Sequence, residues 1–201
     1  MTSLQTGDIL LFFPGSIIGR IAAFFTGGVY SHAALVSVEN GTVYCLEIRE
    51  FLGGRKIELK KYLQEEPATF EVWRLKRTLP DFFYTLVAEK MAEFVGVKYG
   101  WVYVLQAVLL RSALTFFGGR FGRRVWRYFD ESEKHPPFCS EAVSIAYRTA
   151  GMDLCPKIPD RFIFPGDLVK STYLERVGSS GNFVVNKIST KSFMANKTAF
   201  C

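Results

Sequence analysis

The sequence predicts one α+β domain in which a small antiparallel sheet packs against helices. Asn40-Gly41, the strongest two-residue hairpin signal, separates two strand-like runs, 30–38 and 42–48. Two later stretches repeat apolar residues at the spacing of an amphipathic helix. The 201 residues are 49% hydrophobic, which is enough to bury one core without disulfides or metals.

Strands and one short helix are expected before residue 80. The apolar run 7–13 is followed by a Pro-Gly pair and is typical of a buried strand that ends in a turn. Ser16 is a candidate N-cap for a short helix over 17–25. Alternation of apolar and polar residues over 69–76 predicts a further strand.

Longer helices are expected after residue 80. The first covers about 81–95, and its apolar residues at helical spacing would face the core: Phe83, Val87, Met91, Phe94 and Val95. The second, 101–117, is apolar almost all round, but it contains Arg111 and is shorter than the ~20 residues of a membrane span. We therefore expect a buried or lid helix there.

A third helix is expected over about 138–150, ending before Gly151. The stretch 162–171 ("FIFPGDLVKS") predicts a turn followed by a short helix. We expect residues 1–178 to form the domain. The polar, weakly patterned residues 179–201 would form a C-terminal tail or hairpin.

The cysteines indicate a reduced setting. Cys45, Cys139, Cys155 and Cys201 show no CxxC or Cys/His metal spacing, and no secretory segment precedes the first predicted strand. We therefore expect free thiols, no metal or other cofactor, and a cytoplasmic protein.

The net charge of +6 and pI near 9.2 favour anionic partners, but the basic residues cluster only between Arg111 and Arg127. There arginines alternate with aromatics after an apolar helix, which is typical of contact with an anionic membrane surface by a peripheral protein. The candidate contacts are Arg120, Arg123, Arg124 and Arg127. A solvated basic loop is the simpler alternative. Nucleic-acid binding is disfavoured because no recognisable motif accompanies the arginines.

Cys139 is the candidate nucleophile. It follows two prolines and begins the third predicted helix. The N–H groups and the positive dipole end of a helix N-terminus stabilise a thiolate, which is the reactive form of cysteine. The simpler alternative is a small buried side chain, because Ala142, Val143, Ala146 and Ala150 share its helix face.

A thiolate needs a base, and the chain has only two histidines. His32 begins a predicted strand on the same face as Val36. If the hairpin turns at Asn40-Gly41, Val36 pairs near Cys45 and His32 lies near Glu47. Glu47 could then orient the imidazole as the third member of a Cys-His-acid triad.

Two alternatives accompany this triad. Glu47 could instead be a salt-bridge partner for Arg49 or Lys56. His135 is the competing base, four residues before Cys139, but the two prolines between them favour an extended path away from the helix.

The order of these motifs resembles a known family. "GDILLF", "YSHAALV", "YCLEI", "KYGW", "FCSEAVSIAYRTAG" and "FPGDLVKS" follow one another, over about residues 7–172, as in the YiiX-like amidases. These are a circularly permuted branch of the NlpC-type papain-like cysteine hydrolases. The resemblance implies a papain-like fold, in which a small sheet or half-barrel packs against helices and the nucleophile lies at a helix N-terminus.

The resemblance also implies a function. Cys139 would be the nucleophile, His32 the base and Glu47 the orienting acid of an amidase- or peptidase-like hydrolase that forms an acyl-enzyme. Tyr99, Trp101 and Tyr30 are candidate substrate-binding or lid residues. The substrate would be an amide or ester, either peptide or lipid-linked. The alternatives are a membrane-surface acyltransferase, a lipid-directed thiol hydrolase, or a noncatalytic binding module for nucleic acid or membrane on the same fold.

Overall fold

The computed structural model describes residues 3–15, 28–117 and 135–183. Within these ranges, six strands form one antiparallel sheet with the order β4-β3-β2-β1-β5-β6. The predicted α+β class, an antiparallel sheet with helices packed on it, is therefore confirmed. The strands are β1 (Ile9–Phe12), β2 (His32–Glu39), β3 (Thr42–Arg49), β4 (Gly53–Glu58), β5 (Phe70–Leu75) and β6 (Leu174–Ser179).

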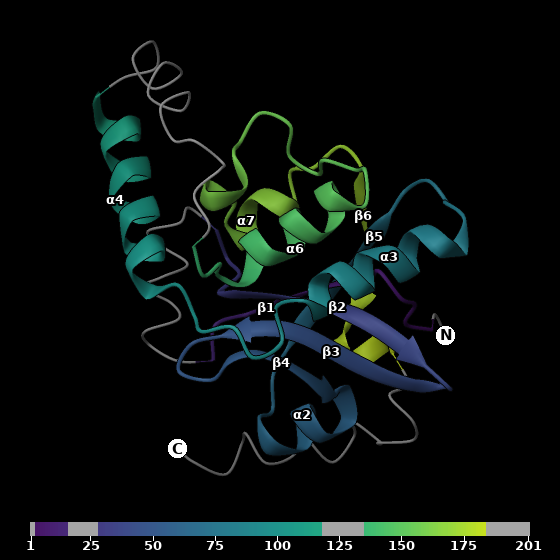
Figure 1. The fold of residues 1–201 in the computed structure, drawn as a ribbon. Coiled ribbons are helices and arrows are strands. Elements are labelled where there is room, and N and C mark those ends of the chain that lie inside the picture. The colour runs from purple at the N-terminus through teal and green to yellow at the C-terminus, as the bar shows by residue number, and fades with distance from the viewer. Residues whose placement is uncertain (1–2, 16–27, 118–134, 184–201) are drawn as a thin grey trace.

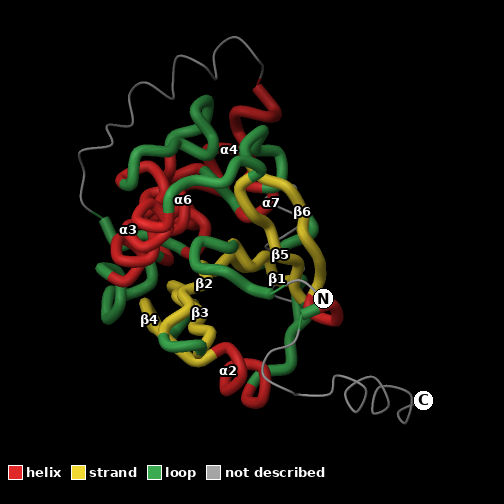
Figure 2. Tube along the Cα trace, turned by 90° about the vertical axis from the view of Figure 1, so that its right-hand side faces the viewer, coloured by secondary structure: helices red, strands yellow, loops and turns green. Residues whose placement is uncertain are grey.

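Helices cover both faces of the sheet (Figures 1 and 2). In Figure 1, α3, α6 and α7 lie on one side of the sheet and α2 lies on the other, while α4 stands at the edge of the molecule. The helices are α2 (Leu59–Glu65), α3 (Asp81–Ala92), α4 (Trp101–Phe117), α6 (Cys139–Thr149) and α7 (Pro165–Leu168), with 3-10 turns η2 (Asp160–Phe162) and η3 (Ser180–Asn182).

Alternation along the strands gives the sheet two apolar faces. Leu35 and Leu46 belong to a core that includes Ala142 and Val143 of α6. Cys45 points to the opposite face, in a core that includes Leu59 of α2. Because successive side chains of a strand point to opposite faces, both cores follow from the same strands.

The β2–β3 hairpin confirms the predicted turn and register. Asn40 and Gly41 have φ of 50° and 78°, the left-handed values that a two-residue turn between twisted strands requires. Val36 pairs with Cys45, as the alternation predicts. This register places the start of β2 beside the end of β3, where the site described below lies.

The end of α3 differs from the prediction. The helix ends at Ala92 instead of about residue 95, and Gly96 takes φ of 85° in the turn that follows. Phe83, Val87 and Met91 are buried as predicted, but Val95 is exposed. The backbone has left the helical path there, so Val95 no longer lies on the core-facing side.

The second predicted helix is correct in its bounds but is not buried. On α4, Ala107 faces the protein while Val102, Leu105 and Leu109 are exposed. None of the helices in the described ranges is long and apolar enough to cross a membrane.

Some elements of the structure were not predicted from the sequence, and some predictions fall on residues outside the described ranges. β4, α2 and β6 are elements that the sequence patterns did not indicate. β6 ends at Ser179 and Phe183 is buried against the α2 side of the sheet. The predicted helix over 17–25, the rest of the C-terminal segment from residue 184, and Arg120, Arg123, Arg124 and Arg127 all lie outside the described residues.

Candidate active site

Cys139 is the first residue of α6, as predicted. Its side chain is buried, but it belongs to a cluster with Phe138, Phe162 and Phe164 and not to the core that contains Ala142. The backbone N–H of a residue at this position has no carbonyl partner within its own helix. The thiol and this N–H therefore lie together at the end of α6.

Hydrogen bonds hold the start of α6 in place. Ser140 donates its hydroxyl to the carbonyl of Ile163 at 2.7 Å. Ser144 donates to the carboxylate of Asp160, also at 2.7 Å. Both hydroxyls are buried, so these bonds tie α6 to η2 and to Ile163, which follows it.

His32 and Glu47 are in direct contact. Nε2 of His32 lies 2.6 Å from Oε2 of Glu47, and both side chains are buried. The other oxygen of Glu47 accepts a hydrogen bond from Nε of Arg55 at 2.7 Å. Residues 47 and 55 are cross-strand partners of β3 and β4, so the sheet itself aligns this ion pair.

The salt-bridge partner of Glu47 is therefore Arg55. The sequence-based candidates, Arg49 and Lys56, pair with other residues. Arg49 pairs with Glu66. Lys56 pairs with Glu39 at 2.5 Å. β4 begins at Gly53, so Arg55 is the residue opposite Glu47 while the side chain of Lys56 points to the other face of the sheet.

Nδ1, the second ring nitrogen of His32, is buried. Among the described residues Nδ1 has no partner with good hydrogen-bond geometry. Cys139 is nevertheless near enough to influence the protonation of the ring. Burial lowers the pKa of His32, but the thiolate of Cys139 and then the carboxylate of Glu47 raise it by charge and by hydrogen bonding, and the pKa ends above its usual 6.5.

Glu47 remains ionised in spite of its burial. Burial raises the pKa of Glu47, but the charge and hydrogen bond of His32, followed by those of Arg55, lower it below 4.5. An ionised Glu47 favours an imidazolium at His32. His32 thus contacts Glu47 directly and lies near enough to Cys139 for the two to interact electrostatically.

His135 does not lead away from α6, as the two prolines predicted. Its Nε2 lies 2.6 Å from Oε1 of Glu141, in the first turn of the helix. Oε2 of Glu141 accepts the N–H of Phe138 at 3.2 Å. The ring of Tyr103 packs on the His135 ring with centroids 4.5 Å apart. The prolines allow an extended path that returns to the helix, because the buried Glu141 carboxylate attracts the imidazole.

The three candidate substrate-binding residues lie in different settings. Tyr99 packs against the cluster that contains Cys139, and burial followed by the charge of Cys139 raises its pKa. Trp101 is half-exposed, with its ring 5.0 Å from that of Tyr99. Tyr30 is buried in the core and donates its hydroxyl to Glu71 at 2.5 Å.

Gly100 lets the segment around Tyr99 approach the residues before Cys139. Its N–H donates to the carbonyl of Pro137 at 3.4 Å. A Cβ at this position would lie 2.0 Å from the carbonyl oxygen of Pro136. Only glycine allows this approach, so Gly100 fixes the path of the chain into α6.

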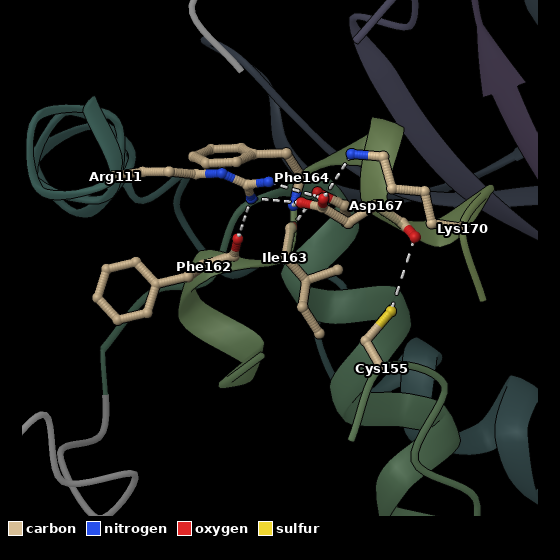
Figure 3. A network of polar contacts seen from close by, with 8 residues as sticks. Arg111, Cys155, Phe162, Ile163, Phe164, Asp167 and Lys170 are labelled. Carbon is tan, nitrogen blue, oxygen red and sulfur yellow. Dashed lines mark hydrogen bonds and ion pairs between the residues drawn. The ribbon is translucent and has the colours of Figure 1, made fainter. Parts of the chain in front are cut away.

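Arg111 fastens α4 beside the site (Figure 3). Its guanidinium makes two contacts with the buried carboxylate of Asp167, at 2.5 and 2.7 Å, and a third with the carbonyl of Phe162 at 3.0 Å. It also lies over the ring of Phe164, 5.2 Å from its centroid. Such a two-point contact is specific to arginine.

A metal does not fit the residues that meet here. Within the described part of the chain, no three His, Cys, Asp or Glu residues are grouped so that they could hold a metal ion. Both carboxylate oxygens of Glu47 are already engaged, one by His32 and one by the cationic Arg55. A cation bound to Glu47 would have to displace Arg55. The described cysteines Cys45, Cys139 and Cys155 are free thiols.

Comparison with solved structures finds a likeness in fold. No family model matches the chain, and no curated protein matches it. The crystal structure of the metalloprotein YiiX from Escherichia coli O157:H7 superposes with a TM-score of 0.61, covering 88% of this chain and 98% of that one. The chain has a YiiX-like fold. At 17% identity the likeness to YiiX concerns the fold alone.

Proposed function

We propose that this protein is a cysteine-dependent hydrolase that cleaves an amide or ester through an acyl-enzyme on Cys139. The single observation that supports it most is the state of the His32 ring, in which Nε2 is bonded to Glu47, Nδ1 has no partner among the described residues, and Cys139 lies near enough to raise the pKa of the ring. Burying an imidazole nitrogen without a hydrogen-bond partner costs free energy, so such an arrangement indicates a functional role for that nitrogen. The order of a histidine strand before a cysteine helix also suits a permuted papain-like hydrolase.

The geometry suggests a two-step reaction. The Cys139 thiolate attacks the carbonyl carbon, and the oxyanion that forms accepts the N–H of Cys139 at the start of α6. The tetrahedral intermediate collapses, and the proton on Nδ1 of His32 passes to the leaving amine or alkoxide. His32 then takes a proton from water, whose oxygen attacks the thioester; the acid leaves, and the Cys139 thiolate and the protonated His32 are restored.

Glu47 and Arg55 act through His32 in this scheme. Glu47 holds the ring so that Nδ1 faces the sulfur and stabilises the imidazolium. Arg55 positions the Glu47 carboxylate from the neighbouring strand. Tyr99 packs on the cluster around the thiol and Trp101 continues this surface outward, which suits both to contact the substrate.

Thiol reactivity tests the proposal without knowledge of the substrate. We expect iodoacetamide at pH 6 to alkylate Cys139 selectively, because in the proposed mechanism the imidazolium of His32 stabilises its thiolate. An ordinary thiol is almost fully protonated at this pH and reacts slowly. Burial raises the pKa of Cys155 to about 12 and that of Cys45 well above its usual value, so neither should compete. Cys201→Ser provides a background in which only the described thiols remain, and intact mass with peptide mapping gives the site.

The controls separate the thiol mechanism from a metal site like the one that YiiX's description suggests. His32→Ala should slow alkylation by about tenfold or more, because the thiolate loses its imidazolium. A chelator should leave the wild-type rate unchanged. An unlabelled Cys139, an unchanged rate in His32→Ala, or protection of Cys139 by added zinc would each argue against the proposal.

A further inference from the structure

The strongest unexplained surface is a group of six large apolar side chains beside the site. Phe51 and Leu52 lie in the β3–β4 turn and are 89% and 56% exposed. Trp101, Val102, Leu105 and Leu109 of α4 are 44–64% exposed. The rings of Phe51 and Trp101 are 5.1 Å apart, which joins the turn to the helix. We call these six residues the α4 apolar face.

The helix α4 turns its charged residue toward the protein and apolar residues toward solvent, which is the reverse of the usual arrangement of a surface helix. Arg111 is the only charged residue of the helix, and it points inward to Asp167 (Figure 3). Val102, Leu105 and Leu109 follow the i, i+3, i+7 spacing and point outward. A helix that is apolar on both sides is normally covered on both sides, and isolated exposed apolar residues do not form such a stripe.

Phe51 gives a second, independent sign. Its φ is 65°, a left-handed value that is costly for a bulky side chain. The 89% exposure of its ring means that burial does not repay this cost. Residues kept in an unfavourable backbone conformation cluster at functional sites.

The charges identify the kind of surface that would cover this face. From Tyr99 through Phe129 the sequence contains five arginines and no Asp or Glu, and the whole chain carries a net charge of +6. Four of these arginines lie outside the described residues, so only the charge of the sequence bears on the partner: an apolar face on a chain of net positive charge suits a lipid surface that presents anionic headgroups over an apolar interior. None of the described helices is long enough to span the bilayer, so contact would be at the interface.

We propose that the α4 apolar face docks on an anionic membrane surface, with Phe51, Trp101, Leu105 and Leu109 inserted among the lipids. The inner side of α4 packs against the cluster of Cys139 through Ala107. Docking therefore sets the thiol site one helix away from the bilayer. This docking does not depend on Cys139 being a nucleophile.

Vesicle co-sedimentation of the full chain tests the docking. We expect wild type to sediment with vesicles of phosphatidylcholine and phosphatidylglycerol, more weakly with phosphatidylcholine alone, and more weakly at high salt. Leu105→Gln/Leu109→Gln, which keeps good helix formers, should lower the bound-to-free ratio by at least about tenfold. Phe82→Gln is the matched control, because Phe82 is a 72% exposed apolar residue on α3 and should bind like wild type.

Phe51→Gly separates docking from folding. Glycine accepts the positive φ, so the melting temperature should stay the same or rise, while vesicle binding falls. The proposal is overturned if wild type does not sediment with anionic vesicles, if it self-associates through this face without binding them, or if Phe51→Gly and Leu105→Gln/Leu109→Gln bind as wild type does.

Discussion

Oε2 of Glu47 lies 2.6 Å from Nε2 of His32, and this contact decides which ring nitrogen is left for Cys139. The carboxylate is fixed in turn by Arg55 on the neighbouring strand. One cross-strand ion pair thus fixes the carboxylate that holds the imidazole, and the other ring nitrogen is buried without a partner among the described residues. The sheet provides the orientation and the helix provides the thiol.

Replacing Glu47 by glutamine should keep the fold and weaken the reaction. The amide side chain retains the shape and a hydrogen-bond acceptor, but the substitution removes the charge that favours the imidazolium and can select the wrong tautomer of His32. We expect Glu47→Gln to label slowly with a thiol reagent and to lose turnover on an amide by orders of magnitude. Melting temperature and labelling rate should be measured together.

Glu39→Gln is the matched control for Glu47→Gln. Glu39 lies on the same hairpin and also forms an ion pair, with Lys56, but it is exposed and stands at the opposite end of β2 from His32. It should label at the wild-type rate. Wild-type behaviour in Glu47→Gln as well would make Glu47 a structural carboxylate.

The pKa of His32 should depend on Cys139. The folded pKa is raised to about 10, so protonated His32 stabilises the fold fully below pH 6.5, and this stabilisation is lost as pH rises through the folded value. In Cys139→Ala the thiolate is absent, so the pKa of His32 should fall. Nuclear magnetic resonance titration can measure it, since His135 is the only other imidazole. An identical His32 pKa in wild type and Cys139→Ala would show that the sulfur does not influence the protonation of the ring.

Gly100→Ala should disturb the chain that leads into α6. The added methyl would meet the Pro136 carbonyl, and relief of this clash must move the residues before Cys139. We expect a loss of about 1–3 kcal/mol in unfolding free energy and slower labelling. Gly181→Ala is the control, since no atom lies within 4 Å of its added methyl. Equal stability of the two variants would mean that Gly100 is not required for the close approach.

Arg111→Lys should loosen α4 although it keeps the charge. Lysine cannot reproduce the two-point contact with Asp167 or the stacking on Phe164. A loss of about 1–3 kcal/mol in unfolding free energy is expected from chemical denaturation. In the control Arg176→Lys, the replaced ion pair is half-exposed and the loss should be within about 0.5 kcal/mol. No difference between the two would remove Arg111 as the anchor of α4.

The hairpin part of the site could be predicted because it depends on local signals. Asn40-Gly41 fixes the turn, and the period of two along β2 and β3 then places His32 beside Glu47. Arg55 was missed because the β3–β4 turn has no such signal. Phe51 has a positive φ in this turn, where glycine or asparagine would be expected from turn preferences.

Features that depend on distant residues could not be predicted. Whether α4 is buried is decided by Arg111 and Asp167, which are 56 residues apart in the sequence. The return of His135 to α6 depends on the buried carboxylate of Glu141, which the Pro-Pro pair does not reveal. Periodicity shows that a helix has an apolar side, but not which surface will cover it.

Trapping the acyl-enzyme tests the central claim most directly. Wild type should be mixed with p-nitrophenyl acetate and quenched in acid, and its intact mass and peptide map recorded. We predict a burst of p-nitrophenol and one acetyl group on Cys139, with neither in Cys139→Ala and a strongly reduced burst in His32→Ala. An acetyl group elsewhere in wild type, or an equal burst in Cys139→Ala, would contradict the assignment of Cys139 as the nucleophile.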